Sequence, residues 1–226
     1  MPKSPRLYPH WLIAPPASHD SAVGPRRSYL AAKRGFDIAF TLMIAPFALA
    51  IVAVLVLLVR LDGEKAFFRQ ARLGKGGRVF HLWKLRTMVP DAEQRLQEYL
   101  DADPLARIEW DRTQKLQNDP RVTMLGKYLR KYSADELPQL LNVLLGDMSL
   151  VGPRPMLPDQ RSQYPGSAYF SLRPGITGLW QISERNMSSF AQRATYDTRY
   201  AGIMSFGTDL SILSRTIFVV LRGTGF

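Results

Sequence analysis

The 226-residue sequence contains no cysteine, which excludes disulfide bonds, a thiolate nucleophile and cysteine-based metal sites. Histidine is also scarce. The three histidines, His10, His19 and His81, are too scattered to indicate a zinc site. Any chemistry in this chain therefore depends on carboxylates, hydroxyls and basic side chains.

Charge is absent from a long apolar run between Ile38 and Val59. At about 1.5 Å per residue, a helix of this length crosses a hydrocarbon core of roughly 30 Å. Pro46 lies inside the run and predicts a kink. Basic residues crowd both flanks, which the positive-inside rule places in the cytoplasm. Two interpretations stay open on these grounds: a spanning helix, or a re-entrant hairpin broken at Ala45-Pro46.

Basic residues dominate the rest of the composition, with a formal net charge of +11 and a pI of about 10.1. Such a balance predicts an anionic partner: nucleic acid, an acidic membrane surface or phosphate-rich ligands. The sequence has no zinc finger and no RNA-recognition motif, so we expect no nucleic acid. With 46% hydrophobic residues, the chain is long enough to form its own core.

Two adjacent carboxylates, Asp135 and Glu136, precede a leucine-rich segment that ends at Gly146. The helical spacing of the leucines predicts one buried apolar face. The acidic pair is then expected at a helix N-terminus, where the macrodipole helps to keep Asp135 ionised. A structural alternative is a capping box formed by Ser133 and Glu136. Pro138 is better tolerated if Asp135 is the N-cap, and spacing alone does not decide between them.

Turn and periodicity signals divide the chain into an irregular N-terminal arm over 1–29, an apolar segment over 30–60 and a larger domain of strands and helices over 61–226. Short strands are expected at 66–68 and 79–83, joined by a basic hairpin turn at 74–77. Helices are expected at 91–100, 105–116, 123–131, 190–200 and 209–221. The fold class is α/β, mainly helical with a few short strands. The apolar stripe of 209–221 fits a membrane-surface helix and a core helix about equally well.

Several long motifs occur in one order along the chain: Phe68-Arg-Gln-Ala-Arg-Leu-Gly74, Trp83-Lys-Leu-Arg-Thr-Met88, Asp119-Pro-Arg-Val-Thr123, Asp135-Glu-Leu-Pro-Gln139, Gly146-Asp-Met-Ser-Leu-Val-Gly-Pro-Arg-Pro155 and Arg173-Pro-Gly-Ile-Thr-Gly-Leu-Trp-Gln181. Together they make the chain similar to the bacterial sugar transferase family, the small monotopic polyprenyl-phosphate phosphoglycosyl transferases. The resemblance covers about residues 30 to 226.

This resemblance implies transfer of a sugar-1-phosphate from a UDP-sugar to undecaprenyl phosphate, with release of UMP. Asp135 would be the nucleophile that forms an aspartyl-phosphosugar intermediate, and Asp135 and Glu136 would hold Mg²⁺. The implied phosphate-binding residues are Lys84, Arg86, Arg130 and Arg154. The implied nucleotide-sugar region contains Arg173, Pro174, Gly175, Thr177, Gln181 and Asp209.

The resemblance also implies the re-entrant form of the membrane segment, bent at Ala45-Pro46, where many relatives have Ser-Pro. The expected location is the bacterial inner membrane, with anionic lipids as partners and the catalytic domain on the cytoplasmic face. Self-association stays open. Relatives often continue Gly-Arg after Gln181, whereas this chain has Glu184-Arg185-Asn186. The donor sugar is therefore open; galactose or glucose is expected first, and N-acetylated sugars next.

A second class of function also fits the composition: a non-catalytic, membrane-anchored basic scaffold that binds anionic lipid or nucleic acid. It accounts for the net charge and the apolar run but not for an acidic pair embedded in a basic chain. A third hypothesis is a membrane phosphotransferase that uses another lipid or donor.

Overall fold

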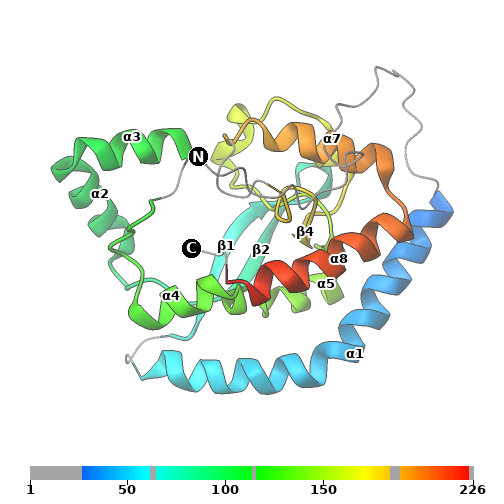
Figure 1. Ribbon diagram of the computed structural model, residues 1–226, viewed down its shortest axis with the longest axis horizontal. Coiled ribbons are helices and arrows are strands. Elements are labelled where there is room, and N and C mark those ends of the chain that lie inside the picture. The colour runs from blue at the N-terminus through cyan, green and yellow to red at the C-terminus, as the bar shows by residue number, and fades with distance from the viewer. Residues whose placement is uncertain (1–26, 62–64, 114–115, 184–188, 224–226) are drawn as a thin grey trace, which may run out of the picture.

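The computed structural model describes residues 27–61, 65–113, 116–183 and 189–223. Figure 1 shows a central hairpin of β1 and β2, with α1 running along the lower edge and α2 and α3 projecting on one side. The elements in chain order are α1 (Arg27–Arg60), β1 (Phe67–Leu73), η2 (Lys75–Gly77), β2 (Val79–Leu85), α2 (Ala92–Ala102), α3 (Pro104–Thr113), α4 (Met124–Lys131), η3 (Ala134–Glu136), α5 (Gln139–Leu145), β3 (Ser149–Val151), η4 (Asp159–Gln163), α6 (Ala168–Ser171), β4 (Gly175–Thr177), α7 (Arg193–Ile203) and α8 (Phe206–Leu221). The prediction of a mostly helical chain with a few short strands is confirmed.

The strands form two small pairs within the described part of the chain. β1 and β2 are antiparallel, with Phe67 opposite Leu85 and Leu73 opposite Val79, so each is longer than the sequence predicted. Their connection is the expected glycine turn, in which Gly76 and Gly77 have φ of +70° and +76°. β3 and β4 are parallel.

The five helices expected after the hairpin are present as α2, α3, α4, α7 and α8, with boundaries shifted by a few residues. Thr123 caps α4 by accepting a hydrogen bond from the Gly126 backbone N–H. The sequence-predicted start of the last helix, Asp209, is not its N-cap. Ser205 caps α8 instead, through a bond from the Thr208 backbone N–H, because α8 begins one turn earlier than its apolar stripe.

α1 is one continuous helix of 34 residues with Pro46 inside it. It is long and apolar enough to cross a membrane, and only 6% of its most apolar window is buried. Figure 1 shows that α1 bends in its middle instead of running straight. A proline inside a helix removes one backbone hydrogen bond and causes such bends. The predicted break at Ala45-Pro46 is therefore a bend within a single helix.

α5 differs from its predicted packing. The side chains it buries are Gln139, Asn142 and Val143, whereas Leu141 and Leu145 are 45% and 65% exposed. The Asn142 side chain accepts a hydrogen bond from the Trp83 backbone N–H and donates one to the His81 carbonyl. The prediction of a buried leucine face is wrong because α5 uses its polar face to bind the β2 backbone.

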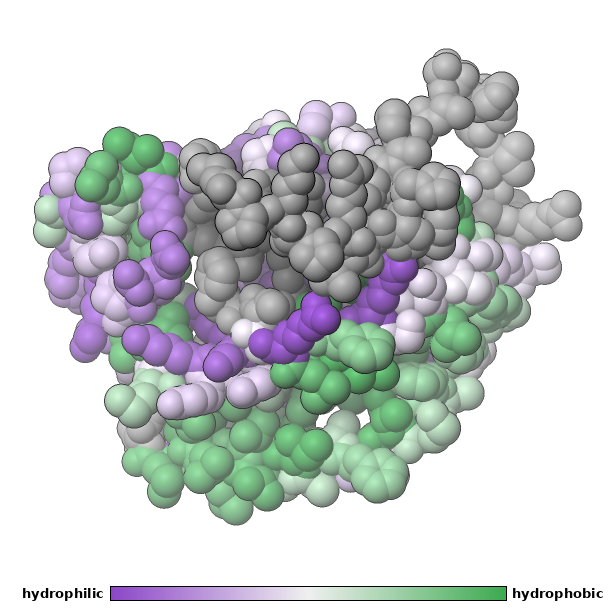
Figure 2. All heavy atoms as spheres, in the orientation of Figure 1, coloured by the Kyte–Doolittle hydropathy of each residue, from purple (hydrophilic) through white to green (hydrophobic). Residues whose placement is uncertain are grey.

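Apolar side chains are exposed on several helices. We call the exposed side chains of α1, α4 and α5 the apolar face; its largest members are Leu42, Met43, Phe47, Leu49, Ile51, Val54, Leu57, Leu58, Met124, Leu141 and Leu145. Figure 2 shows apolar residues covering the lower part of the molecule, where α1 runs in Figure 1. An uncovered surface of this kind is rare on a soluble monomer and is typical of contact with a membrane or a partner.

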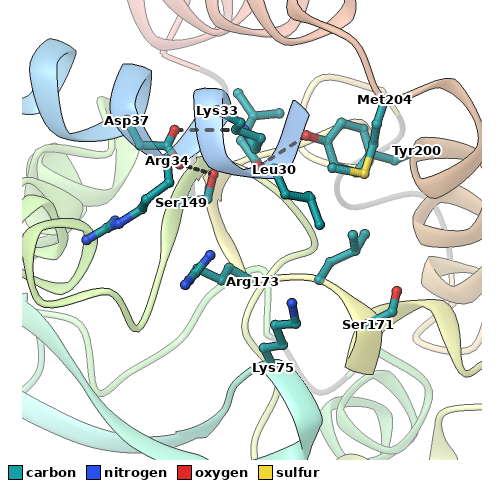
Figure 3. A pocket seen from close by; sticks show the side chains of 12 residues that line it. Leu30, Lys33, Arg34, Asp37, Lys75, Ser149, Ser171, Arg173, Tyr200 and Met204 are labelled. Carbon is teal, nitrogen blue, oxygen red and sulfur yellow. Dashed lines mark hydrogen bonds and ion pairs between the residues drawn. The ribbon is translucent and has the colours of Figure 1, made fainter. Parts of the chain in front are cut away.

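Buried polar contacts join the first half of α1 to the rest of the molecule. Asp37 accepts hydrogen bonds from the Ser149 hydroxyl (2.7 Å) and the Leu150 backbone N–H (3.2 Å). Figure 3 shows Lys33, Asp37 and Ser149 around this contact. The second half of α1 packs through Val59 against Leu85 and Leu129. Both halves of α1 therefore contact the same body.

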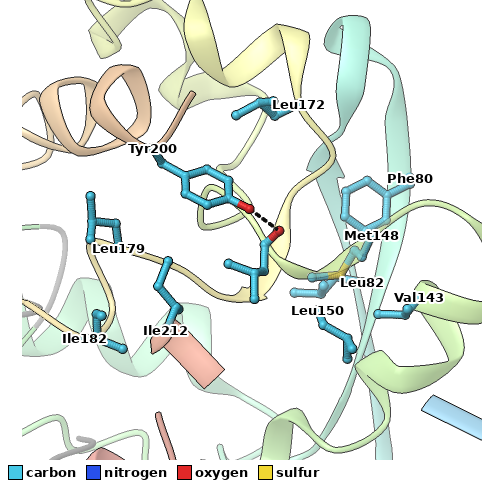
Figure 4. Packing of buried hydrophobic residues seen from close by; sticks show 11 residues of the cluster. Phe80, Leu82, Val143, Met148, Leu150, Leu172, Leu179, Ile182, Tyr200 and Ile212 are labelled. Atoms are coloured by element: carbon cyan, nitrogen blue, oxygen red, sulfur yellow. Dashed lines mark hydrogen bonds between the residues drawn. The ribbon is translucent and has the colours of Figure 1, made fainter. Parts of the chain in front are cut away.

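The main core lies between the hairpin, the β3–β4 pair and α8. Figure 4 shows Leu82, Met148, Leu150 and Ile212 gathered in this core, together with Tyr200. The hydroxyl oxygen of Tyr200 lies 3.3 Å from the Val151 carbonyl oxygen. This core fixes β2 beneath the turn that carries the acidic pair.

Candidate active site

Asp135 and Glu136 lie in the short turn η3, between α4 and α5. The Ser133 side chain makes no capping bond and its φ is +54°, so the capping box is absent. Neither proposed N-cap is correct. Pro138, with φ of −61°, immediately precedes α5, because a proline has no N–H to continue a helix from Ser133. The acidic pair thus precedes the helix and is not part of its first turn.

Lys84 of β2 binds both carboxylates. Its Nζ lies 2.8 Å from Glu136 Oε1 and 3.4 Å from Asp135 Oδ2. The Arg154 Nη2 lies 3.2 Å from the same Glu136 oxygen. Arg154 stands in the Gly-Pro-Arg-Pro turn, where two prolines restrict the backbone. The structure therefore brings four of the predicted residues into one ion-paired group.

Burial raises the pKa of the Asp135 carboxyl, and the neighbouring charge of Glu136 raises it further, whereas Lys84 and Arg130 lower it. The expectation that a helix N-terminus keeps Asp135 ionised is not supported, since η3 is a single short turn. Lys84 and Arg130 favour the ionised form of Asp135, but burial has the larger effect on its pKa. A nearly buried carboxylate beside a lysine is well placed to be a nucleophile.

Arg130 and Arg86 line the same cleft but bind elsewhere. The Nε of Arg130 donates to the Thr87 hydroxyl at 2.9 Å. The Arg86 guanidinium donates to the carbonyls of Val59, at the end of α1, and Lys65. Arg86 therefore fastens the end of α1 to β2 while it faces the cleft.

The carboxylates open into a cleft of about 580 Å³, large enough for a nucleotide-sized ligand. One wall is formed by β1, β2 and η3. The opposite wall includes Trp110 and Leu116, in and after α3, and Arg121, whose guanidinium lies 5.1 Å from the Trp110 ring. Because most charged residues of the cleft are basic, it is suited to an anionic ligand.

Comparison with known proteins identifies the family of this chain. A sequence profile described as bacterial sugar transferase matches residues 28–223. The chain belongs to the bacterial sugar transferase family. The resemblance inferred from the motifs is confirmed.

Similar members of the family include an exopolysaccharide production protein ExoY of Sinorhizobium fredii, 46% identical over 200 residues that cover 85% of this chain and 87% of the relative. The undecaprenyl-phosphate galactose phosphotransferase of Salmonella typhimurium is 43% identical over 88% of this chain and 42% of its own length. The UDP-galactose-lipid carrier transferase of Erwinia amylovora is 44% identical over 85% of this chain and 41% of its own length. The chain thus matches about two fifths of the last two proteins.

The residues predicted for the nucleotide-sugar region do not line the cleft in the described part of this sugar transferase. Arg173 donates through Nε to the Gly146 carbonyl, and the Pro174 carbonyl accepts from the Ser149 backbone N–H. Gly175 lies close to the Gly152 backbone, leaving no room for a side chain.

The remaining members of that set are also buried away from the cleft. Thr177 bonds through its hydroxyl to Thr216 at 2.7 Å. Asp209 accepts hydrogen bonds from Tyr29, Lys33 and Tyr200. Among the residues that the structure describes, the buried Gln181 amide has no hydrogen-bond partner for either polar atom. In the Arg173–Gln181 motif, Trp180 is the described residue that lines the cleft.

The sequence analysis assigned no role to Arg72 and Arg193, two further arginines at this site. Arg72 lines the cleft, and its buried Nε has no hydrogen-bond partner. Arg193 lies 4.3 Å above the Trp180 ring, and its buried Nε is also without a partner. Burial and the charge of Arg154 lower the pKa of both guanidinium groups. Arg72 belongs to the Phe68–Gly74 motif, so the sequence drew attention to it only as a basic residue without an assigned role.

Proposed function

We propose that this chain is a phosphoglycosyl transferase that moves a hexose-1-phosphate from a UDP-sugar to undecaprenyl phosphate and releases UMP. The observation that carries the proposal is the buried Asp135 beside Glu136, held by Lys84 and Arg154 in a basic cleft. Family membership supports the same reaction class. The reaction would be the first membrane step of exopolysaccharide or other glycoconjugate synthesis, with galactose or glucose as the expected sugar.

In the proposed first step, a carboxylate oxygen of Asp135 attacks the phosphorus that carries the sugar. A bond forms between that oxygen and phosphorus, the bond to the bridging oxygen breaks, and UMP leaves with the electron pair. In the second step, an oxygen of undecaprenyl phosphate attacks the same phosphorus and Asp135 leaves as a carboxylate. The surrounding cations, Lys84, Arg130 and Arg154, stabilise the charge that develops.

Magnesium is an expected cofactor. It prefers oxygen ligands and is often held by one or two carboxylates together with substrate phosphates. Asp135 and Glu136 supply such oxygens, and both already contact one cationic group, the Lys84 ammonium, which supports this assignment. The pair fits that mode of binding, with substrate phosphate completing the ligand set. When bound, the ion would neutralise phosphate charge.

The membrane arrangement is part of the proposal. Both halves of α1 contact one body, through Asp37 near its start and Val59 near its end. A straight spanning helix would separate these ends by the thickness of the bilayer. We place α1 as a bent, re-entrant helix in the bacterial inner membrane, with the catalytic domain on the cytoplasmic face and the apolar face toward lipid. The basic surface would then contact anionic headgroups.

The test is UMP release by the full chain in detergent with Mg²⁺, undecaprenyl phosphate and a panel of UDP-sugars. We expect release that requires the lipid and one donor, and a loss of about 10³-fold or more in Asp135→Asn. Asp111→Asn is the matched control, since Asp111 is an exposed carboxylate of α3.

If Asp135→Asn still released UMP, Asp135 would not be the nucleophile. If the folded protein released no UMP from any UDP-sugar, the proposed reaction with a UDP-sugar donor would be wrong. A panel of other nucleotide sugars would then follow. Salt-sensitive binding to lipid or nucleic acid without turnover would favour the scaffold hypothesis.

A further inference from the structure

A second cavity, of about 30 Å³, lies outside the cleft of Asp135. Its walls come from α1, η2, β3 and the segment before β4. Figure 3 shows Arg34, Lys75 and Arg173 approaching this space from three separate segments. None of the residues that line it is shared with the cleft of Asp135. The cavity is therefore a separate feature of the molecule.

The charge of this cavity is positive. Lys33, Arg34, Lys75 and Arg173 line it, together with a single carboxylate, Asp37. Asp37 is already bound by the Ser149 hydroxyl and the Leu150 N–H, and Lys33 is paired with Asp209 at 2.7 Å. In the described part of the chain, no carboxylate forms an ion pair with Arg34, Lys75 or Arg173. Asp37 favours the charged form of Arg34 without pairing with it, so three cations line the cavity beside one carboxylate that is bound elsewhere.

A structural role explains part of this arrangement. Arg34 donates to the carbonyls of Val143 and Leu144, and Arg173 donates to that of Gly146, so both arginines cap the end of α5. A helix C-terminus carries only about half a negative charge. It does not balance two guanidinium groups. Arg173 uses only Nε in this contact, which leaves its terminal nitrogens for a ligand.

Capping does not explain Lys75. Its side chain lies at the exposed turn η2, in which Gly76 and Gly77 adopt left-handed conformations that glycine accommodates best. These glycines fix the direction of the turn. Figure 3 shows the Lys75 amine in the space beside Arg173. An anion bound in this space would be attracted by both side chains.

The cavity lies at the border of the apolar face. Arg34 stands one turn before Ile38, where the uncharged part of α1 begins. Its partner Leu144 is next to Leu145, which is 65% exposed. Arginine and lysine at the end of a membrane-inserted segment lie at the depth of the lipid headgroups. The cavity holds little more than one water molecule, which is enough for phosphate oxygens but not for a nucleotide or a sugar.

We propose that Arg34, Lys75 and Arg173 bind the phosphate group of an anionic membrane phospholipid. Bidentate guanidinium contacts and a lysine ammonium are the usual partners of phosphate. The bound lipid would join α1, η2 and the segment before β4, and so fix the catalytic domain on the membrane surface. The site is distinct from that of the substrate lipid in the proposed reaction, so it is independent of turnover.

The test is binding of dihexanoyl phosphatidylglycerol to the full chain in a neutral detergent, measured by native mass spectrometry. Asp135→Asn is the background, so the outcome does not depend on catalysis. We expect Lys75→Glu to weaken binding by about tenfold. Arg78→Glu is the matched control: Arg78 is exposed, lies three residues away and does not line the cavity. We expect the affinity of Arg78→Glu for this lipid to stay within about twofold of the background.

Equal losses in the two variants would show general surface attraction and overturn the site. Unchanged binding in Lys75→Glu would also overturn it. Dihexanoyl phosphatidylcholine and inorganic phosphate are the comparison ligands. If inorganic phosphate displaced the phosphatidylglycerol at equal concentration, the site would be one for free phosphate, and the lipid assignment would be wrong.

Discussion

Lys33 of α1 and Asp209 of α8 form a buried ion pair, with 2.7 Å between Nζ and Oδ2, across 176 residues of sequence. Tyr29 and Tyr200 donate to the same carboxylate, at 2.9 and 2.6 Å. An acidic residue that the family resemblance assigned to the nucleotide-sugar region therefore joins α1 to α7 and α8. These contacts give Asp209 a structural role.

Asp209→Ala is expected to destabilise the protein. The substitution leaves the buried Lys33 ammonium with only its longer contact to Asp37, at 3.8 Å, and removing one partner of a buried ion pair costs about 3–5 kcal/mol. Thermal unfolding in detergent measures the effect. The double variant Lys33→Met/Asp209→Leu removes both charges and should recover much of the stability. Loss of turnover in Asp209→Ala at unchanged stability would contradict this role and return Asp209 to the active site.

The activity of Asp135 should depend on pH through Lys84. Burial raises the pKa of Asp135 above its ordinary value, and a nucleophile must be ionised, so turnover should fall as pH drops through that raised pKa. Lys84→Ala removes a cation that lowers this pKa. We expect the acidic limb of the pH–rate profile to move to higher pH, with kcat falling about 100-fold.

Lys84→Arg is the control for that experiment, because it keeps the positive charge beside the carboxylates. It should keep the acidic limb near its original pH. If Lys84→Ala and Lys84→Arg gave the same profile, the charge of Lys84 would not control Asp135.

Asp197 should make the protein less stable as pH rises from about 4 to about 7. Burial raises the pKa of Asp197 to about 7, and its carboxyl accepts a hydrogen bond from the Tyr164 hydroxyl. The folded state then holds a proton that the unfolded state loses, so stability is greatest below the unfolded pKa and decreases up to the folded one. Asp197→Asn should flatten this dependence between about pH 4 and about pH 7, measured by thermal unfolding. Asp111→Asn should leave it unchanged, and an unchanged slope in Asp197→Asn would exclude Asp197 as its source.

Two glycines in helices should respond oppositely to alanine. A Cβ at Gly126 of α4 would lie 2.1 Å from the Thr87 carbonyl oxygen, whereas one at Gly202 of α7 would meet nothing within 4 Å. Helix propensity alone favours alanine at both by about 1 kcal/mol. We expect Gly202→Ala to raise the free energy of unfolding and Gly126→Ala to lower it. If Gly126→Ala instead raised the free energy of unfolding, α4 would be free to shift away from β2.

The absence of cysteine allows a direct test of the membrane topology. Ser28→Cys and Leu61→Cys place single thiols at exposed positions at the two ends of α1. In the re-entrant arrangement, a membrane-impermeant maleimide labels both in inside-out vesicles and neither in intact spheroplasts. Arg78→Cys, on the catalytic domain, is the control. A spanning α1 would give opposite labelling at the two ends.

The sequence by itself determined the family, the order of the helices, the β1–β2 hairpin and the chemistry available. These depend on local patterns: a run without charge, the positions of glycine and proline in turns, and short sequence motifs. It also identified Asp135, Glu136, Lys84 and Arg154, which the structure brings together.

Only the tertiary structure decided which face of α5 is buried and where Asp209 and Arg173 lie. Helical periodicity shows that leucines share a face, but not whether protein or membrane covers it. Asn142 resolves this, because its amide binds the β2 backbone and turns the leucines outward. The same long-range packing leaves Arg72 and Arg193 desolvated beside the cleft and places Arg34, Lys75 and Arg173 around one cavity. Contacts between segments so far apart in sequence have no local signature.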